Sequence, residues 1–130
     1  MSCQERLKIG SGYPMEAQVG YSRAIRVGSR VYVAGTVASD ETGAVVSPGD
    51  GYLQAKYILE KIGRALAQAG ASMEHVVRTR MFVTDITRAS EFGRAHGEFF
   101  RDIRPVATMV EVKALVDPGF LIEIEVDAEL

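Results

Sequence analysis

Apolar residues recur at two different spacings along this chain, and the order in which these spacings follow each other limits the folds open to it. A strand-like alternation occupies five segments, residues 24–27, 30–34, 76–84, 107–112 and 121–128. A helix-like spacing of three and four residues occupies two segments, one ending at Gly70 and one between Thr87 and Pro105. The order strand, strand, helix, strand, helix, strand, strand predicts an α+β fold, with two helices on one face of a mostly antiparallel sheet.

Turn and cap residues predict where these elements begin and end. Gly28-Ser29 is typical of a two-residue hairpin turn between the first two strands. Ser47 followed by Pro48 predicts the N-cap and first position of the first helix, and Thr87 predicts the cap of the second. We expect the segment 117–119, Asp-Pro-Gly, to form the turn that joins the last two strands.

Length and composition favour one domain over residues 1–130, because 130 residues with 47% apolar content suit a single core. Apolar runs are short, and residues 1–10 lack the apolar block of a secretory signal, so we expect a cytoplasmic protein without a membrane partner. The lone Cys3 agrees with a reducing compartment. The net charge of −2, with dispersed Lys and Arg, disfavours a nucleic-acid partner.

Metal and cofactor motifs are not visible in the sequence. His75 and His96 are far apart, and neither HExxH nor CxxC spacing occurs, so we expect no metal and no cofactor. The consecutive apolar residues 81–83 in one strand predict that both sheet faces are covered. At this chain length the second cover has to come from another subunit, so we expect an oligomer.

Three features could carry chemistry. Glu123, Glu125 and Asp127 share one face of the last strand, which fits either a general acid or base or a solvated strand face. Tyr21 and Arg23 share a face of another strand, and together they could bind a carboxylate. The helix glycines at positions 93 and 97 indicate either close backbone packing, which we favour, or space left for another group.

Seven segments, in order and at matching intervals, resemble proteins of the RidA (YjgF) family. They are YSRAI at 21–25, VYVAG at 31–35, AGAS at 69–72, VTDI at 83–86, FF at 99–100, PVATMVEV at 105–112 and IEIE at 122–125. The resemblance implies a chorismate-mutase-like homotrimer with ligand clefts between subunits. In archetypal members an arginine binds the carboxylate of a 2-imino acid while a glutamate helps water attack the C=N carbon, which releases ammonia and a 2-keto acid.

The family's site residues match this chain only in part. Tyr21, Gly35 and Glu123 correspond to the cleft tyrosine, the cleft glycine and the glutamate that positions water. Ala107 stands where the family has its arginine, and Met109 stands where it has a cysteine. The chain therefore resembles a branch that lacks the catalytic arginine. Arg23 or Arg104 could supply a cation in its place.

From the resemblance we expect a homotrimer that binds a small metabolite in its inter-subunit clefts, with Glu123 as catalytic residue and Tyr21, Arg23, Gly35, Ala107 and Met109 lining the substrate site. The implied activity is that of a hydrolase like a 2-iminobutanoate/2-iminopropanoate deaminase. The alternative is a non-catalytic metabolite-binding or interaction trimer. Ribonuclease activity, which has been attached to relatives of the family, is disfavoured by the acidic charge balance.

Overall fold

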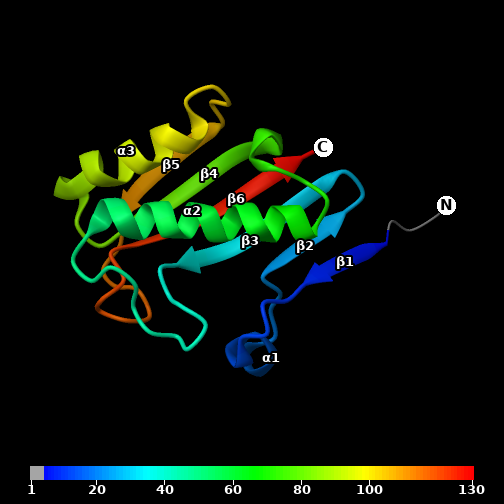
Figure 1. Cartoon of the computed structure of the whole chain (residues 1–130), viewed down its shortest axis with the longest axis horizontal. Coiled ribbons are helices and arrows are strands. Elements are labelled where there is room, and N and C mark those ends of the chain that lie inside the picture. Colours follow the sequence, from blue (N-terminus) through cyan, green and yellow to red (C-terminus); the bar gives the residue numbers. More distant parts are fainter. Residues whose placement is uncertain (1–4) are drawn as a thin grey trace.

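The computed structural model describes residues 5–130 and has a six-stranded sheet at its centre (Figure 1). The strands are β1 (Arg6–Ile9), β2 (Ala24–Val27), β3 (Arg30–Val37), β4 (Val76–Val83), β5 (Val106–Glu111) and β6 (Ile122–Glu129). Their order in the sheet is β1-β2-β3-β6-β4-β5, and all neighbours are antiparallel except the parallel pair β4 and β5. This arrangement confirms the predicted α+β fold with a mostly antiparallel sheet.

Two long helices, α2 (Gly51–Gln68) and α3 (Ala89–Phe100), cover one face of this sheet, as predicted. A short helix, α1 (Pro14–Val19), lies apart from them near β1 (Figure 1). Single 3₁₀ turns, η1 (Met73–His75) and η2 (Ile86–Arg88), precede β4 and α3. The sequence did not predict β1 or α1, and the lone Cys3 lies outside the described residues.

The core forms between the two long helices and the alternating side chains of the sheet. On β6, Ile122, Ile124, Val126 and Ala128 are each at most 2% exposed. They meet the buried stripe of α2, which is Ile58, Leu59, Ile62 and Leu66. Burying each large aliphatic side chain contributes about 1.5–3 kcal/mol, so this layer holds β6 at the middle of the sheet. Glu123, Glu125 and Asp127 consequently project from the opposite face.

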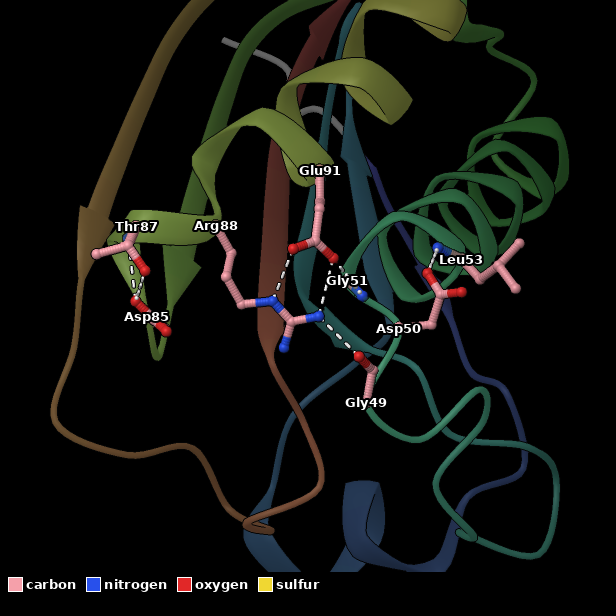
Figure 2. Close-up of polar contacts among 8 residues, drawn as sticks. All are labelled: Gly49, Asp50, Gly51, Leu53, Asp85, Thr87, Arg88 and Glu91. Atoms are coloured by element: carbon pink, nitrogen blue, oxygen red, sulfur yellow. Dashed lines mark hydrogen bonds and ion pairs between the residues drawn. The ribbon is translucent and has the colours of Figure 1, made fainter.

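Both helices begin later than the sequence predicted. The N-cap of α2 is Asp50, whose Oδ1 accepts a hydrogen bond from the Leu53 amide at 2.9 Å (Figure 2). Ser47 has a positive φ of 49° and lies outside the helix, so its assignment as N-cap was wrong, because that position takes an extended backbone. Thr87 was also wrong as a cap, because it belongs to η2 and donates its amide to Asp85.

The starts of α2 and α3 are tied together by Arg88 and Glu91 (Figure 2). The Arg88 guanidinium contacts Glu91 at 2.8 Å and donates to the Gly49 carbonyl at 2.7 Å. The Glu91 carboxylate also accepts the Gly51 amide at 3.2 Å. These bonds satisfy polar groups at the beginning of α2 and fix the position of α3 beside it.

The parallel pair β4 and β5 is connected through α3, so β5 lies at the edge of the sheet (Figure 1). The predicted turn forms, because the Asp117 carboxylate accepts the Gly119 amide at 2.8 Å. However, the turn leads β6 past β4 to a place between β3 and β4, so the last two strands are not neighbours. This topology decides on which face each candidate site residue lies.

Candidate functional site

The site residues predicted from the sequence fall on opposite faces of the sheet. Glu123 is paired with Phe82 of β4, whereas Ala107 and Met109 of β5 are paired with Thr79 and Met81. Paired residues share a face, and successive residues alternate. Thr79 and Met81 are buried on the helix-covered face, so Ala107 and Met109 point to that face and Glu123 points to the other. Within one chain the sheet separates them.

On the open face, the carboxyl group of Glu123 packs directly over the backbone of Gly35. A Cβ atom added to Gly35 would lie 2.4 Å from Oε1 and 3.0 Å from Cδ of Glu123. The β3–β6 ladder is irregular between Val33 and Thr36, at the position of this glycine. The absence of a side chain at Gly35 therefore creates the space that the Glu123 carboxyl occupies.

Burial raises the pKa of Glu123 above its ordinary value. The nearby Arg23 guanidinium opposes this rise, and the charge of Glu125 adds to it. The dominant cause is loss of hydration, which disfavours the charged form of the carboxyl. A carboxylate with a raised pKa is a stronger base than an exposed one, which suits a group that accepts a proton from water.

The Arg23 guanidinium lies near this carboxyl, and it bonds to the backbone of Gly35 on β3. Its Nη2 donates a hydrogen bond to the Gly35 carbonyl at 2.5 Å, and its guanidinium carbon lies 5.9 Å from the centre of the Tyr21 ring. The Arg23 Nε is buried and has no hydrogen-bond partner among residues 5–130. The structure thus brings together four predicted site residues, Tyr21, Arg23, Gly35 and Glu123. None of these four residues lines the hollow of about 360 Å³ on this part of the sheet, whose lining includes their chain neighbours Ser22 and Ala34 together with Tyr32 and Glu125.

The segment before β2 positions Tyr21 through backbone hydrogen bonds. Helix α1 ends at Gly20, which has a φ of 91°, and the Tyr21 amide donates to the Glu16 carbonyl at 2.9 Å. The buried Glu16 carboxylate accepts the amide of Ser11 at 3.1 Å and also its hydroxyl. This supporting role of Glu16 is not visible in the sequence, because no motif marks a carboxylate that closes a local loop.

On the helix-covered face, the surroundings of Ala107 are open. Ala107 is exposed at the edge of the sheet, and Met109 is half-buried against the core. A Cβ atom added to Gly93 or Gly97 of α3 would meet no atom within 4 Å. Our expectation that these glycines allow close backbone packing was therefore wrong, and each borders free space.

The arginines near β5 bond to groups other than those around Ala107. Arg80 pairs with Glu125 at 3.3 Å and with Asp127 at 3.4 Å on the open face. Arg104 is exposed, has a φ of 57°, and donates its Nε to the Arg101 carbonyl at 3.3 Å. Within the described part of the chain, no arginine or lysine occupies a helix-side position of β4 or β5.

No group of three or more His, Cys, Asp or Glu side chains is arranged to hold a metal ion in residues 5–130. None of the helices described is both long enough and apolar enough to span a membrane.

Comparison with known proteins gives consistent matches over nearly the whole chain. The sequence profile of the family described as endoribonuclease L-PSP matches residues 13–130. A crystal structure of a Mycobacterium tuberculosis protein from the YjgF/YER057c/UK114 family is 48% identical, with a TM-score of 0.88, and the match covers 97% of this chain and all of that one.

Two curated relatives are similar at lower identity. An uncharacterized protein of Streptomyces coelicolor is 35% identical over 98% of this chain and 95% of its own length. The 3-aminoacrylate deaminase RutC of Acinetobacter baylyi is 35% identical over 80% of this chain and 82% of its own length.

Proposed function

Because this chain belongs to the endoribonuclease L-PSP family, which includes YjgF-type proteins, we propose that it binds a small metabolite and hydrolyses it with Glu123 as catalytic residue. The observation that carries this proposal is the half-buried Glu123 carboxyl, which lies over Gly35 and has a pKa raised by burial. Perturbed carboxyls of this kind are frequent where a proton is transferred.

The reaction we propose is hydrolytic deamination of an imine or of the enamine from which it forms. A water oxygen attacks the C=N carbon, and the electron pair of the C=N π bond moves to nitrogen. Glu123 accepts the proton that the water loses and passes it to this nitrogen, which gives a carbinolamine. Glu123 then transfers the remaining hydroxyl proton to the nitrogen in the same way. The C–N bond breaks with its electron pair leaving on nitrogen, ammonia departs, and the carbon becomes a carbonyl. The relative RutC, named as a 3-aminoacrylate deaminase, acts on a substrate of this chemical class.

We propose further that the complete site forms between subunits of a homotrimer. One chain separates Glu123 from Ala107 and Met109 by the thickness of the sheet. The open face also carries exposed apolar side chains, including Tyr32 at 40%, Val106 at 57% and Val110 at 42%. Exposed apolar surface of this kind is typical of a subunit interface. Sedimentation at three times the chain mass of 14.1 kDa is the expected result, and a monomer would refute it.

The second candidate is a binding trimer without catalysis, and one observation favours it. Ala107 leaves its surroundings without the guanidinium that orients the ligand in archetypal members, and within residues 5–130 no other cation occupies a helix-side position of β4 or β5. Saturable binding of a ligand that is recovered chemically unchanged would support this candidate over the hydrolase. For ribonuclease activity, the open-face arginines offer little, because Arg78 and Arg80 are already paired with acidic residues.

The test of the proposed function compares two matched variants on one strand. Ammonia release from freshly generated imines would be measured for the native chain, Glu123→Gln and Glu129→Gln. We expect Glu123→Gln to lower kcat/KM by about 10²–10⁴-fold, the usual contribution of a general base. Glu129→Gln, at the exposed end of the same strand, should leave the rate unchanged. Equal rates for Glu123→Gln and the native chain would exclude the proposed role.

A further inference from the structure

A hydrogen-bonded pair, His96 and Thr79, lies next to Ala107. The Thr79 hydroxyl and the His96 Nε2 are 2.9 Å apart, and Thr79 is completely buried. Thr79 and Ala107 are register partners on β4 and β5. Their side chains therefore point to the same face from strands about 4.8 Å apart. The Thr79 side chain is thus the β4 neighbour, on the same face, of any side chain that residue 107 would carry.

The free space beside α3 opens on the same side. Arg94 stacks on the ring of Tyr52 at 3.8 Å, and Glu98 accepts a hydrogen bond from the Tyr52 hydroxyl, so this flank of α3 faces α2. Gly93 and Gly97 lie on the other flank, toward β5, by the helical repeat of 3.6 residues. They precede and follow His96, and nothing would contact a Cβ atom at either position.

The imidazole has a hydrogen-bonding position that the protein does not use. Nε2 is bonded to Thr79, and Nδ1 has no partner among residues 5–130. Nδ1 is also not completely buried, because Arg23 Nε is the single unpartnered side-chain nitrogen or oxygen that is fully buried in that part of the chain. The ring is held in place by contact with Phe100, with 4.7 Å between the ring centres.

Neither His96 nor the helix-side positions of β5 supply a positive charge beside Ala107. Burial lowers the pKa of His96, so the imidazole is neutral near pH 7. The charged side chain at the helix-side positions of β5 is Glu111, whose carboxylate accepts the Ile86 amide at 3.0 Å. A ligand carboxylate would therefore meet the neutral His96 ring and the negative charge of Glu111. A neutral carbonyl or amide that forms a hydrogen bond would have only a small free-energy cost of leaving water.

We propose that His96, oriented by Thr79, binds a neutral carbonyl or amide group of the ligand in the space beside Ala107, so that the ligand class is a neutral amide-like metabolite and not an acid. This inference rests on the proposed function, because it takes the surroundings of Ala107 as part of the ligand site. It deepens that proposal by replacing recognition of a carboxylate with recognition of an uncharged polar group.

The test uses pyruvamide and pyruvate, which differ mainly in charge. Binding of each to the full chain would be titrated by NMR. We expect pyruvamide to bind at least tenfold more tightly than pyruvate. His96→Phe keeps the aromatic contact with Phe100 but removes the hydrogen bond, and it should weaken pyruvamide binding about tenfold. His96→Gln should restore part of the affinity, and His75→Phe, at the distant histidine, should change nothing.

Three outcomes would overturn the inference, provided that circular dichroism shows each variant folded. They are pyruvate binding as tight as that of pyruvamide, unchanged pyruvamide binding in His96→Phe, and no binding of either compound. Different outcomes refute this inference and the proposed function. Imine hydrolysis that requires Glu123 but is indifferent to His96→Phe would refute this inference alone, whereas His96-dependent binding without any hydrolysis would refute the hydrolase alone.

Discussion

Replacing Gly35 with alanine should displace the Glu123 carboxyl while leaving the fold intact. The new Cβ would lie 2.4 Å from Oε1, 3.0 Å from Cδ and 3.3 Å from Cγ of Glu123. Ordinary contacts between such atoms are about 3.5 Å or longer, so the carboxyl end has to move by roughly 1 Å. A displacement of about 1 Å in a catalytic site can lower the rate on the order of 10²-fold.

The cost in stability should be small, because the group that has to move is the end of a flexible side chain. We expect Gly35→Ala to reduce the free energy of unfolding by less than about 2 kcal/mol, since displacing a side chain from a favoured position costs about that much at most. Urea denaturation would measure stability, and steady-state ammonia release would measure kcat/KM.

Gly63→Ala is the matched control for this prediction. Gly63 lies inside α2, and an added Cβ would meet only Met73 at 3.9 Å. Alanine in a helix interior should raise the free energy of unfolding by about 0.5–1 kcal/mol and leave activity unchanged. Native kcat/KM in Gly35→Ala would refute the reasoning, because it would show that catalysis does not depend on where the Glu123 carboxyl lies.

Three further outcomes follow from the structure. Asp50→Ala should lower the free energy of unfolding by about 1 kcal/mol in urea denaturation, because it removes the N-cap of α2. Ser47→Ala should leave it unchanged. A larger loss in Ser47→Ala than in Asp50→Ala would contradict the assignment of Asp50 as the N-cap. Glu123→Gln should raise the melting temperature at pH 7. The pKa of Glu123 is higher in the folded chain than in the unfolded chain, so folding favours the protonated carboxyl. The native glutamate therefore lowers the free energy of unfolding once the pH rises above the ordinary pKa of a glutamate. This gain should shrink toward pH 4, and a gain independent of pH would contradict it. For the same reason, kcat/KM of the native chain should fall as the pH is lowered, and the midpoint of this fall should lie above the ordinary pKa of an exposed glutamate.

The fold could be predicted largely from alternation and helical spacing, because these patterns determine which side chains are buried. β6 is the clearest case, with Ile122, Ile124, Val126 and Ala128 buried and the intervening acids outside the core. β1 escaped prediction because it has four residues, and Ile9 is the one that is buried. Helix α1 has six residues, too few for a helical repeat to be visible.

The site was predictable in its residues but not in its arrangement. Glu123 and Gly35 meet across an irregular part of the β3–β6 ladder, and no local pattern encodes that register. The separation of Ala107 from Glu123 depends on β5 pairing in parallel with β4, which requires knowledge of the topology. The open space at Gly93 and Gly97 could not be inferred either, because a helix glycine fits both close packing and free space.

The most direct test of the account follows ammonia release from 2-iminopropionate and from its neutral amide, for the native chain, Ala107→Arg and Glu123→Gln. We predict that the native chain hydrolyses the amide better and that Ala107→Arg shifts preference to the acid by 30-fold or more, since a desolvated charge pair is worth about 2–5 kcal/mol. Glu123→Gln should lower both activities by about 10²–10⁴-fold. Hydrolysis at the native rate in Glu123→Gln, or hydrolysis that is absent for both substrates in the native chain and in Ala107→Arg, would contradict the proposal that Glu123 activates water in this site.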